Sequence, residues 1–196
     1  MSSIEPQELE QLQEAGRRMY ASGLTTGTLG SIGVRLPGGA VAVTAVGTRI
    51  GQLNSKDFLV LDSNHQPIRQ NGRGAVMDAK MLAAVLETQL AAGSVIRVTS
   101  PYTTALARSG EELIRQSEEM LEPVGGVAFV PYFRPGTVGL AGAVSEALRT
   151  NRAAIIEGQG AVLWGTDIDD AVDCAEALEA AAKVIFILDG KDDAEY

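Results

Sequence analysis

Two hydrophobic periodicities alternate along the chain. Apolar residues recur every three or four positions in long segments, which is typical of amphipathic helices, and β-branched residues gather in short runs between them, which is typical of strands. Helices are therefore predicted over residues 5–22, 74–92, 111–121, 138–149 and 167–188, with a further helix from Pro101. Strands are predicted over residues 32–35, 40–45, 95–99 and 124–130, and two more on either side of a turn at residues 158–160. Strands that alternate with helices predict a layered α/β fold.

The strand predicted over residues 95–99 ends at Ser100 and Pro101, where a helix begins. Proline fits the first turn of a helix, because its missing N–H would have no partner there in any case. Arg97 and Thr99 alternate to the same face of this strand. One positive charge and one hydroxyl therefore project together from the end of a buried strand, which is a common place for binding and catalytic residues.

Composition narrows the class of protein. The 196 residues predict one domain, residues 1–196, with a flexible tail over residues 189–196, and a content of 45% hydrophobic and 21% charged residues is ordinary for a soluble globular chain. The net charge of −9 argues against a nucleic-acid-binding surface, and no apolar run is long enough to cross a membrane. Residues 1–14 are too polar for a secretory signal, and the single cysteine, Cys174, excludes an internal disulfide framework. We therefore expect a cytoplasmic protein.

The only histidine in the sequence is His65. It falls in a turn predicted over residues 62–66, where an exposed turn residue is expected. A Ser-His-Asp triad would have to use this residue, and a zinc site with two or three histidines is impossible within one chain.

Asp78 is the acid whose position needs an explanation. In the predicted helix it shares a face with Met81, Leu82 and Val85, so its carboxylate should point into an apolar region and needs a partner there. The alternative is an ordinary acid in the first turn of a helix. Three acids in the first turn of the last helix are interpreted as helix caps rather than metal ligands: Asp167, Asp169 and Asp170. Cys174, in the same helix, is interpreted as a small core residue.

Several of these segments resemble the class II aldolase/adducin family, in particular its fuculose-phosphate aldolases. The metal-binding strand of that family reads His-Thr-His-Ser-Pro-Tyr-x-Thr-Ala-Leu, and six positions match it here: Ser100, Pro101, Tyr102, Thr104, Ala105 and Leu106. Residues 27–35 and 131–137 match two further family motifs, and the resemblance extends from Leu9 to Leu188 in the same order.

The resemblance implies a fold and a departure from the family's chemistry. The family fold is a three-layer α/β/α sandwich with a mixed, largely antiparallel sheet, here with a short helix and a third strand over residues 53–62. Its members commonly form ring-like tetramers with sites between subunits. Three histidines bind zinc in the family, and their positions carry Arg97, Thr99 and Gln159 in this chain. The catalytic glutamate of the family corresponds to Asp78.

The family's phosphate pocket is also altered. Ser31 replaces an asparagine, and Val76 and Met77 replace two serines. The resemblance still implies a polar rim around this pocket, formed by four residues: Thr28, Thr44, Gly47 and Tyr132.

Two hypotheses follow. The first is an aldolase-like enzyme without metal or other cofactor, in which Asp78 and Arg97 catalyse a lyase or isomerase reaction on a small carbonyl or carboxylate metabolite. Its substrate would be bound by Thr28, Ser31, Thr44, Gly47, Thr99, Tyr132 and Gln159.

The second hypothesis is a catalytically inactive homo-oligomer, similar to the adducin head, with a structural or regulatory role. In that case Arg97 and Asp78 form a structural ion pair. A polar, solvent-reachable site favours the enzyme, and a site filled by Val76, Met77 and Val98 favours the scaffold. Both hypotheses include a homo-oligomer, expected to be a tetramer, and neither includes nucleic acid or membrane as a partner.

Overall fold

The computed structural model describes residues 4–68, 72–109, 114 and 118–192. A seven-stranded sheet crosses the molecule in the order β3-β2-β1-β4-β7-β6-β5. The strands are β1 (Ser31–Arg35), β2 (Val41–Thr44), β3 (Phe58–Val60), β4 (Ser94–Val98), β5 (Val127–Val130), β6 (Ala153–Ile156) and β7 (Gly160–Gly165). Among these strands only β5 and β6 run parallel, and every other neighbouring pair is antiparallel.

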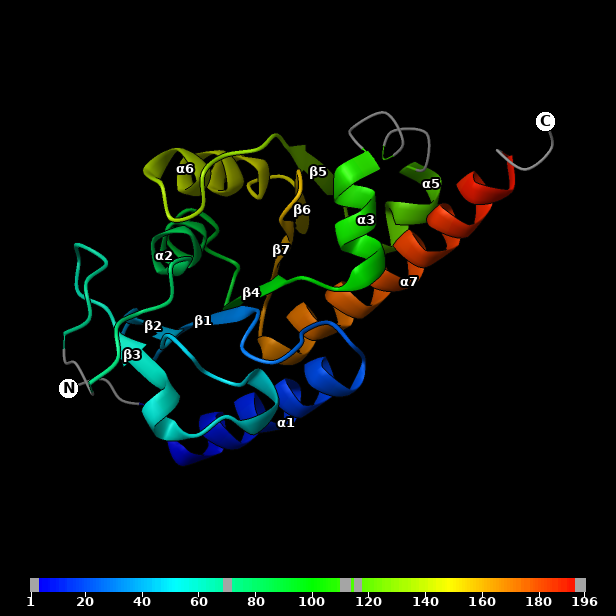
Figure 1. The fold of residues 1–196 in the computed structure, drawn as a ribbon. Coiled ribbons are helices and arrows are strands. Elements are labelled where there is room, and N and C mark those ends of the chain that lie inside the picture. The colour runs from blue at the N-terminus through cyan, green and yellow to red at the C-terminus, as the bar shows by residue number, and fades with distance from the viewer. Residues whose placement is uncertain (1–3, 69–71, 110–113, 115–117, 193–196) are drawn as a thin grey trace.

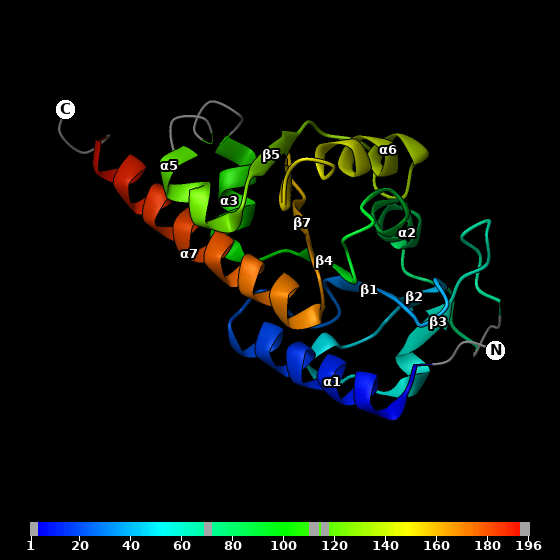
Figure 2. The same ribbon diagram turned by 180° about the vertical axis from the view of Figure 1, so that it is seen from behind.

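Helices cover both faces of the sheet. One face carries α2 (Ala79–Thr88) and α6 (Val138–Ala147), and the other carries α1 (Pro6–Ala21), α3 (Pro101–Ser109), α5 (Glu118–Leu121) and α7 (Ile168–Asp192) (Figure 1). The view from behind shows α7 and α1 together on the same side (Figure 2). Short 3-10 turns lie at η1 (Ile50–Gln52), η2 (Ser55–Asp57) and η3 (Glu122–Val124). The predicted three-layer α/β/α sandwich with a mixed, largely antiparallel sheet is confirmed.

The core has two halves, one on each side of the sheet. Alternate residues of the central strand β4 divide between them, because Ile96 and Val98 pack towards α1 and α7 while Val95 packs towards α2 and α6. Arg97 follows the alternation onto the face that α2 covers. Cys174 lies in the first half, where burial raises the pKa of its thiol to about 11, as expected for a small core residue.

The helix predicted from residue 74 begins only at Ala79. Residues 74–76 pair instead with the chain that leaves β2: Val46 N–H donates to the Gly74 carbonyl at 2.8 Å, and Val76 N–H donates to the Thr44 carbonyl at 3.2 Å. A turn over Met77 and Asp78 then leads into the helix. The same helix ends at Thr88 rather than at residue 92.

Other boundaries differ for local reasons. The strand predicted from residue 124 begins at Val127, because Gly125 and Gly126 adopt positive φ angles of 86° and 96°. The last helix continues past Leu188 to Asp192, into the predicted tail, and residues 193–196 lie outside the described chain. Most of the helix predicted over residues 111–121 also lies outside it, and its end is the helix α5.

His65 adopts the predicted turn, with φ of 58°, yet its side chain is only 24% exposed. Its Nε2 lies 2.8 Å from Glu87 Oε1. The predicted turn is confirmed, but the predicted exposure of its histidine was wrong, because the side chain lies against Glu87 of α2.

One carboxylate holds the start of α3. Glu179 of α7 accepts hydrogen bonds from Tyr102 N at 3.0 Å, from Thr103 N at 2.8 Å, from Thr103 Oγ1 at 2.7 Å and from Ser100 Oγ at 2.6 Å. The N-terminal amides of a helix have no partner within the helix, and their dipoles favour an anion, so this contact fixes α3 against α7.

We predict that Glu179→Ala lowers the free energy of unfolding by about 2–3 kcal/mol, because four donors lose a charged acceptor. Urea denaturation followed by circular dichroism measures the difference. Glu10→Ala, which removes an exposed carboxylate from α1, is the matched control and should change stability by less than about 0.5 kcal/mol. Equal effects of the two variants would contradict this account of α3.

A second carboxylate joins α1 to α7. Arg18 donates through Nη2 to Glu176 Oε2 at 2.6 Å and also binds Asp173, and Ser22 Oγ donates to Glu176 at 2.7 Å. The hydrogen bond from Arg18 lowers the pKa of Glu176 against the opposing effect of burial.

We predict that Glu176→Gln destabilises the fold at pH 7 by less than about 1 kcal/mol, since the pair is partly exposed. Because the pKa of Glu176 is lowered in the folded state, its contribution to stability is present above the pKa of the unfolded state, about 4.3. That contribution is lost as the pH falls through the pKa of the folded state. Urea unfolding at pH 7, 5 and 3 should therefore show the difference from the unmodified protein disappear at the acid end. A difference that grows on acidification would contradict the assignment.

Candidate functional site

The register of β1 and β4 places the first two side chains of the site. Ser31 is the direct cross-strand partner of Arg97. Directly opposed residues of an antiparallel pair project to the same face, about 5 Å apart. The hydroxyl of Ser31 and the guanidinium of Arg97 therefore lie together on the face of the sheet that α2 covers.

Asp78 reaches this pair from the residue that precedes α2. Its Oδ2 accepts a hydrogen bond from Ser31 Oγ at 3.1 Å and lies 3.4 Å from Arg97 Nη1. The side chain makes no capping bond to α2, so Asp78 is not an ordinary first-turn acid. The partners that a buried carboxylate was expected to need at this position are Ser31 and Arg97.

Arg97 joins the cluster to the turn between β6 and β7. Its Nη2 donates to the Gln159 carbonyl at 3.0 Å, and the Gln159 side chain donates from Nε2 to the Phe133 carbonyl at 2.7 Å. The side chains of Arg97 and Asp78 are 18% and 12% exposed, so both retain some contact with solvent. Two of the five guanidinium N–H groups suffice for the contacts that Arg97 makes within the described chain, and the others can serve a bound anion.

The close packing of the β6–β7 turn fixes Gln159. A Cβ on Gly160 would lie 2.3 Å from the Val98 carbonyl, so only glycine lets this turn lie against the end of β4. Thr99, just beyond β4, has a buried hydroxyl with no hydrogen-bond partner in the part of the chain that the structure describes. A buried hydroxyl without a partner is costly, and a ligand group at this point would satisfy it.

The other predicted substrate-binding residues do not join the cluster. Thr44 is completely buried, and its Oγ1 accepts the Ile32 N–H at 3.2 Å, so it supports the β1–β2 pairing. Thr28 and Gly47 lie on exposed loops, and Tyr132 is 61% exposed with its N–H directed to Glu157. None of the four has a hydrogen bond to Asp78 or Arg97 within the described chain.

The donor set does not fit the zinc that the family resemblance implies. Arg97 carries a permanent positive charge, and Thr99 and Gln159 are not usual zinc ligands. No group of three or more His, Cys, Asp or Glu side chains in the described parts of the chain is arranged to hold a metal ion. The cluster instead combines a fixed cation, a carboxylate and two hydroxyls, which can bind an anion and move a proton.

Sequence reasoning missed the part that backbone carbonyls play. The carbonyl groups of Gln159 and Phe133 complete the cluster, and no residue type signals such a contact. It depends on how residues 131–137 pass over the β6–β7 turn.

These features define an α/β/α sandwich protein with a polar cluster at the end of its central strand. The family described as "Class II Aldolase and Adducin N-terminal domain" matches residues 10–186. The chain belongs to this family, as its motifs predicted.

Similar proteins within the family have named activities. A 3-oxo-tetronate 4-phosphate decarboxylase of Haemophilus influenzae is 30% identical over 187 residues, which cover 93% of this chain and 88% of that protein. An L-fuculose phosphate aldolase of Methanococcus maripaludis is 26% identical, with 88% and 92% covered. Among solved structures, YgbL of Klebsiella pneumoniae superposes with a TM-score of 0.81 at 27% identity, covering 93% of this chain and 89% of that one.

No helix in the described parts of the chain is long and apolar enough to cross a membrane.

Proposed function

We propose that the chain is a metal-independent carbon–carbon lyase that acts on a small phosphorylated carbonyl compound. The observation that carries the proposal is the cluster of Arg97, Asp78 and Ser31, with Oδ2 of Asp78 placed 3.4 Å from the guanidinium and 3.1 Å from the hydroxyl. A fixed cation beside a proton-transferring carboxylate is the minimum that such a reaction needs.

Arg97 serves as the electrostatic catalyst. When the bond between the α-carbon of a substrate ketone and the carbon beyond it breaks, its electron pair moves into an enolate whose oxygen becomes negative. A guanidinium in a partly dehydrated site stabilises this oxygen without reorganising during the reaction. The paired N–H groups of a guanidinium also bind a carboxylate, so Arg97 can bind the carboxylate of an oxo acid.

Asp78 transfers the proton. In a decarboxylation the bond to the carboxylate carbon breaks, carbon dioxide leaves, and a proton adds to the carbon that keeps the electron pair. In an aldol cleavage a base first removes the hydroxyl proton, and the same enolate forms. Asp78 lies where it can donate or accept this proton, and Ser31 orients its carboxylate.

The names of the relatives support this reaction class. The names decarboxylase and aldolase both denote cleavage of a carbon–carbon bond, here in a phosphorylated compound, and 3-oxo-tetronate 4-phosphate is the first compound to assay. Of the three side chains that would fill the site in a scaffold protein, Met77 is 67% exposed, Val98 packs on the opposite face of the sheet, and Val76 is partly buried against the core on the α2 side. Two of the three do not fill the site, which favours the enzyme.

We predict that Asp78→Asn lowers kcat by roughly a hundredfold to ten-thousandfold and that Arg97→Met lowers it by roughly a hundredfold to a thousandfold. The assay follows release of carbon dioxide or aldehyde from 3-oxo-tetronate 4-phosphate and a panel of ketose 1-phosphates. Asp62→Asn, in an exposed turn, and Arg149→Met, in the turn that follows α6, each remove one charge of the same sign as the residue they control for and should retain full activity. The proposal would be contradicted if the folded variants Asp78→Asn and Arg97→Met retained activity within threefold of the unmodified protein.

We predict that active protein purified without chelator contains far less than one zinc per chain and keeps its turnover in EDTA, because the ligand positions carry Arg97, Thr99 and Gln159. Elemental analysis and the same assay test this. Stoichiometric zinc, or loss of turnover that added zinc restores, would contradict metal independence and leave the reaction class intact.

A structural homo-oligomer is the second candidate, and one observation favours it. The end of α7 exposes four large apolar side chains, each 45–47% accessible: Val184, Phe186, Ile187 and Leu188. Exposed apolar groups of this kind mark interaction surfaces. The homo-tetramer inferred from the family stays a prediction, and an oligomer without turnover of any compound in the panel would favour the scaffold.

A further inference from the structure

The turn between β6 and β7 holds the loop that follows β5 through two side chains. β5 and β6 run parallel, so the chain leaves both strands at the same end of the sheet. Glu157 Oε2 accepts the Tyr132 N–H at 3.1 Å, and Gln159 Nε2 donates to the Phe133 carbonyl at 2.7 Å. Two successive residues of the loop are therefore held from one turn.

Gln159 makes contacts in two directions. Its side chain is buried in a residue that is 8% exposed, and its amide nitrogen is engaged by the Phe133 carbonyl. Its own main-chain carbonyl accepts the hydrogen bond from Arg97 Nη2 at 3.0 Å. Buried amides are usually paired within the protein, and this one joins the loop after β5 to the residue that holds the guanidinium.

The same loop also lies against the turn that carries Asp78. A Cβ on Gly136 would lie 2.7 Å from Met77 Cγ and 3.6 Å from the Met77 carbonyl oxygen, so the main chain of the loop contacts the residue before Asp78. Phe133 packs against the half of the core that lies on the α2 and α6 side. The loop therefore bridges the turn that holds Arg97 and the turn that carries Asp78.

We propose that Gln159 is a positioning residue of the candidate site rather than a ligand of the substrate. Its amide fixes the loop of residues 132–136, and this loop, together with the Gln159 carbonyl, sets the guanidinium of Arg97 and the carboxylate of Asp78 relative to each other. The effect on catalysis rests on the proposed lyase function. The dependence of the loop on Gln159 does not, and can be measured whether or not a reaction is found.

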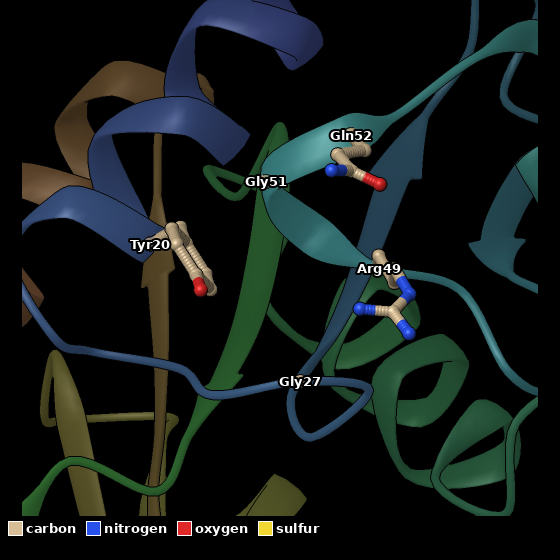
Figure 3. Close-up of a pocket in the computed structure, with 5 residues that line it drawn as sticks. All are labelled: Tyr20, Gly27, Arg49, Gly51 and Gln52. Atoms are coloured by element: carbon tan, nitrogen blue, oxygen red, sulfur yellow. The ribbon is translucent and has the colours of Figure 1, made fainter.

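A matched control lies on the other face of the sheet. Gln13 of α1 is also partly buried, and its Nε2 donates to the Leu53 carbonyl at 2.9 Å. Leu53 follows η1, which lies against α1, because a Cβ on Gly51 would be 2.9 Å from Tyr20 Cβ; Figure 3 shows the two elements side by side. Gln13→Met and Gln159→Met each remove one amide that donates to a main-chain carbonyl, and only the second lies at the candidate site.

Peptide-resolved hydrogen–deuterium exchange, measured by mass spectrometry, tests the dependence of the loop. In Gln159→Met, exchange of residues 132–137 should be about threefold to tenfold faster, because opening of the loop no longer breaks the bond from Gln159. Exchange of residues 76–78 should also rise, since the loop lies against them. Gln13→Met should leave both segments unchanged. Gln159→Asn keeps the donor on a shorter side chain, should give intermediate rates, and replaces Gln159→Met if that variant does not fold.

Turnover tests the effect on catalysis. For any compound of the panel that reacts, Gln159→Met should lower kcat by roughly tenfold to a hundredfold, because a displacement of about 1 Å between reacting groups costs that much. KM should change by less than about threefold, since the groups that contact the substrate remain. Gln13→Met should leave both constants unchanged.

Several results would overturn the assignment. Unchanged exchange of residues 132–137 in Gln159→Met, or equal acceleration by Gln13→Met, contradicts the tie between the turn and the loop, and unchanged exchange of residues 76–78 contradicts its extension to Asp78. A raised KM with unchanged kcat makes Gln159 a substrate ligand. Faster exchange with both constants unchanged separates the loop from the chemistry. If no compound turns over while exchange still depends on Gln159, the lyase proposal fails and the tie between turn and loop stands.

Discussion

A permanently charged side chain on the central strand of the sheet is the constraint that shapes this end of the molecule. A guanidinium carries a permanent positive charge, so the charge of Arg97 must be compensated where it stands. Two groups from different parts of the chain do so, the carboxylate of Asp78 and the carbonyl of Gln159. The residue before α2 and the β6–β7 turn are thereby drawn to the same end of β4, which is the arrangement that a reaction site needs.

The position of Asp78 depends on a contact that is distant in sequence. Residues 74–76 pair with the chain leaving β2, and a turn over Met77 and Asp78 then leads into α2, which begins at Ala79. If the helix began at residue 74, as its apolar spacing suggests, Asp78 would lie within the second turn and its carboxylate would follow the apolar face. The late start of α2 therefore leaves Asp78 in the turn before the helix, where its carboxylate contacts Ser31 and Arg97.

Much of the fold could be predicted because it depends on local pattern. Apolar spacing located the main helices, and β-branched runs bounded by glycine located most strands. Arg97, Ser31, Asp78 and Gln159 could be singled out together only through the family resemblance, and the structure does bring them together. Thr44 shows the limit of inference from the family resemblance, because its hydroxyl accepts the Ile32 N–H and supports the β1–β2 pairing instead of joining the cluster. The Phe133 carbonyl was missed, since its contact with Gln159 arises from a loop whose path no single residue type reveals.

A guanidinium in place of a metal changes what decides the outcome of the reaction. A metal ion polarises whichever oxygens complete its coordination sphere, whereas a guanidinium held by Asp78 and Gln159 presents its free N–H groups in one plane and in one direction. It stabilises the same enolate whether the departing group is carbon dioxide or an aldehyde. The choice between the two then depends on which substrate bond is held perpendicular to the carbonyl plane, and that orientation is set by contacts remote from the reacting carbon. In a site of this kind the anchoring of the far end of the substrate is part of the catalytic apparatus, because a small displacement there changes which bond breaks.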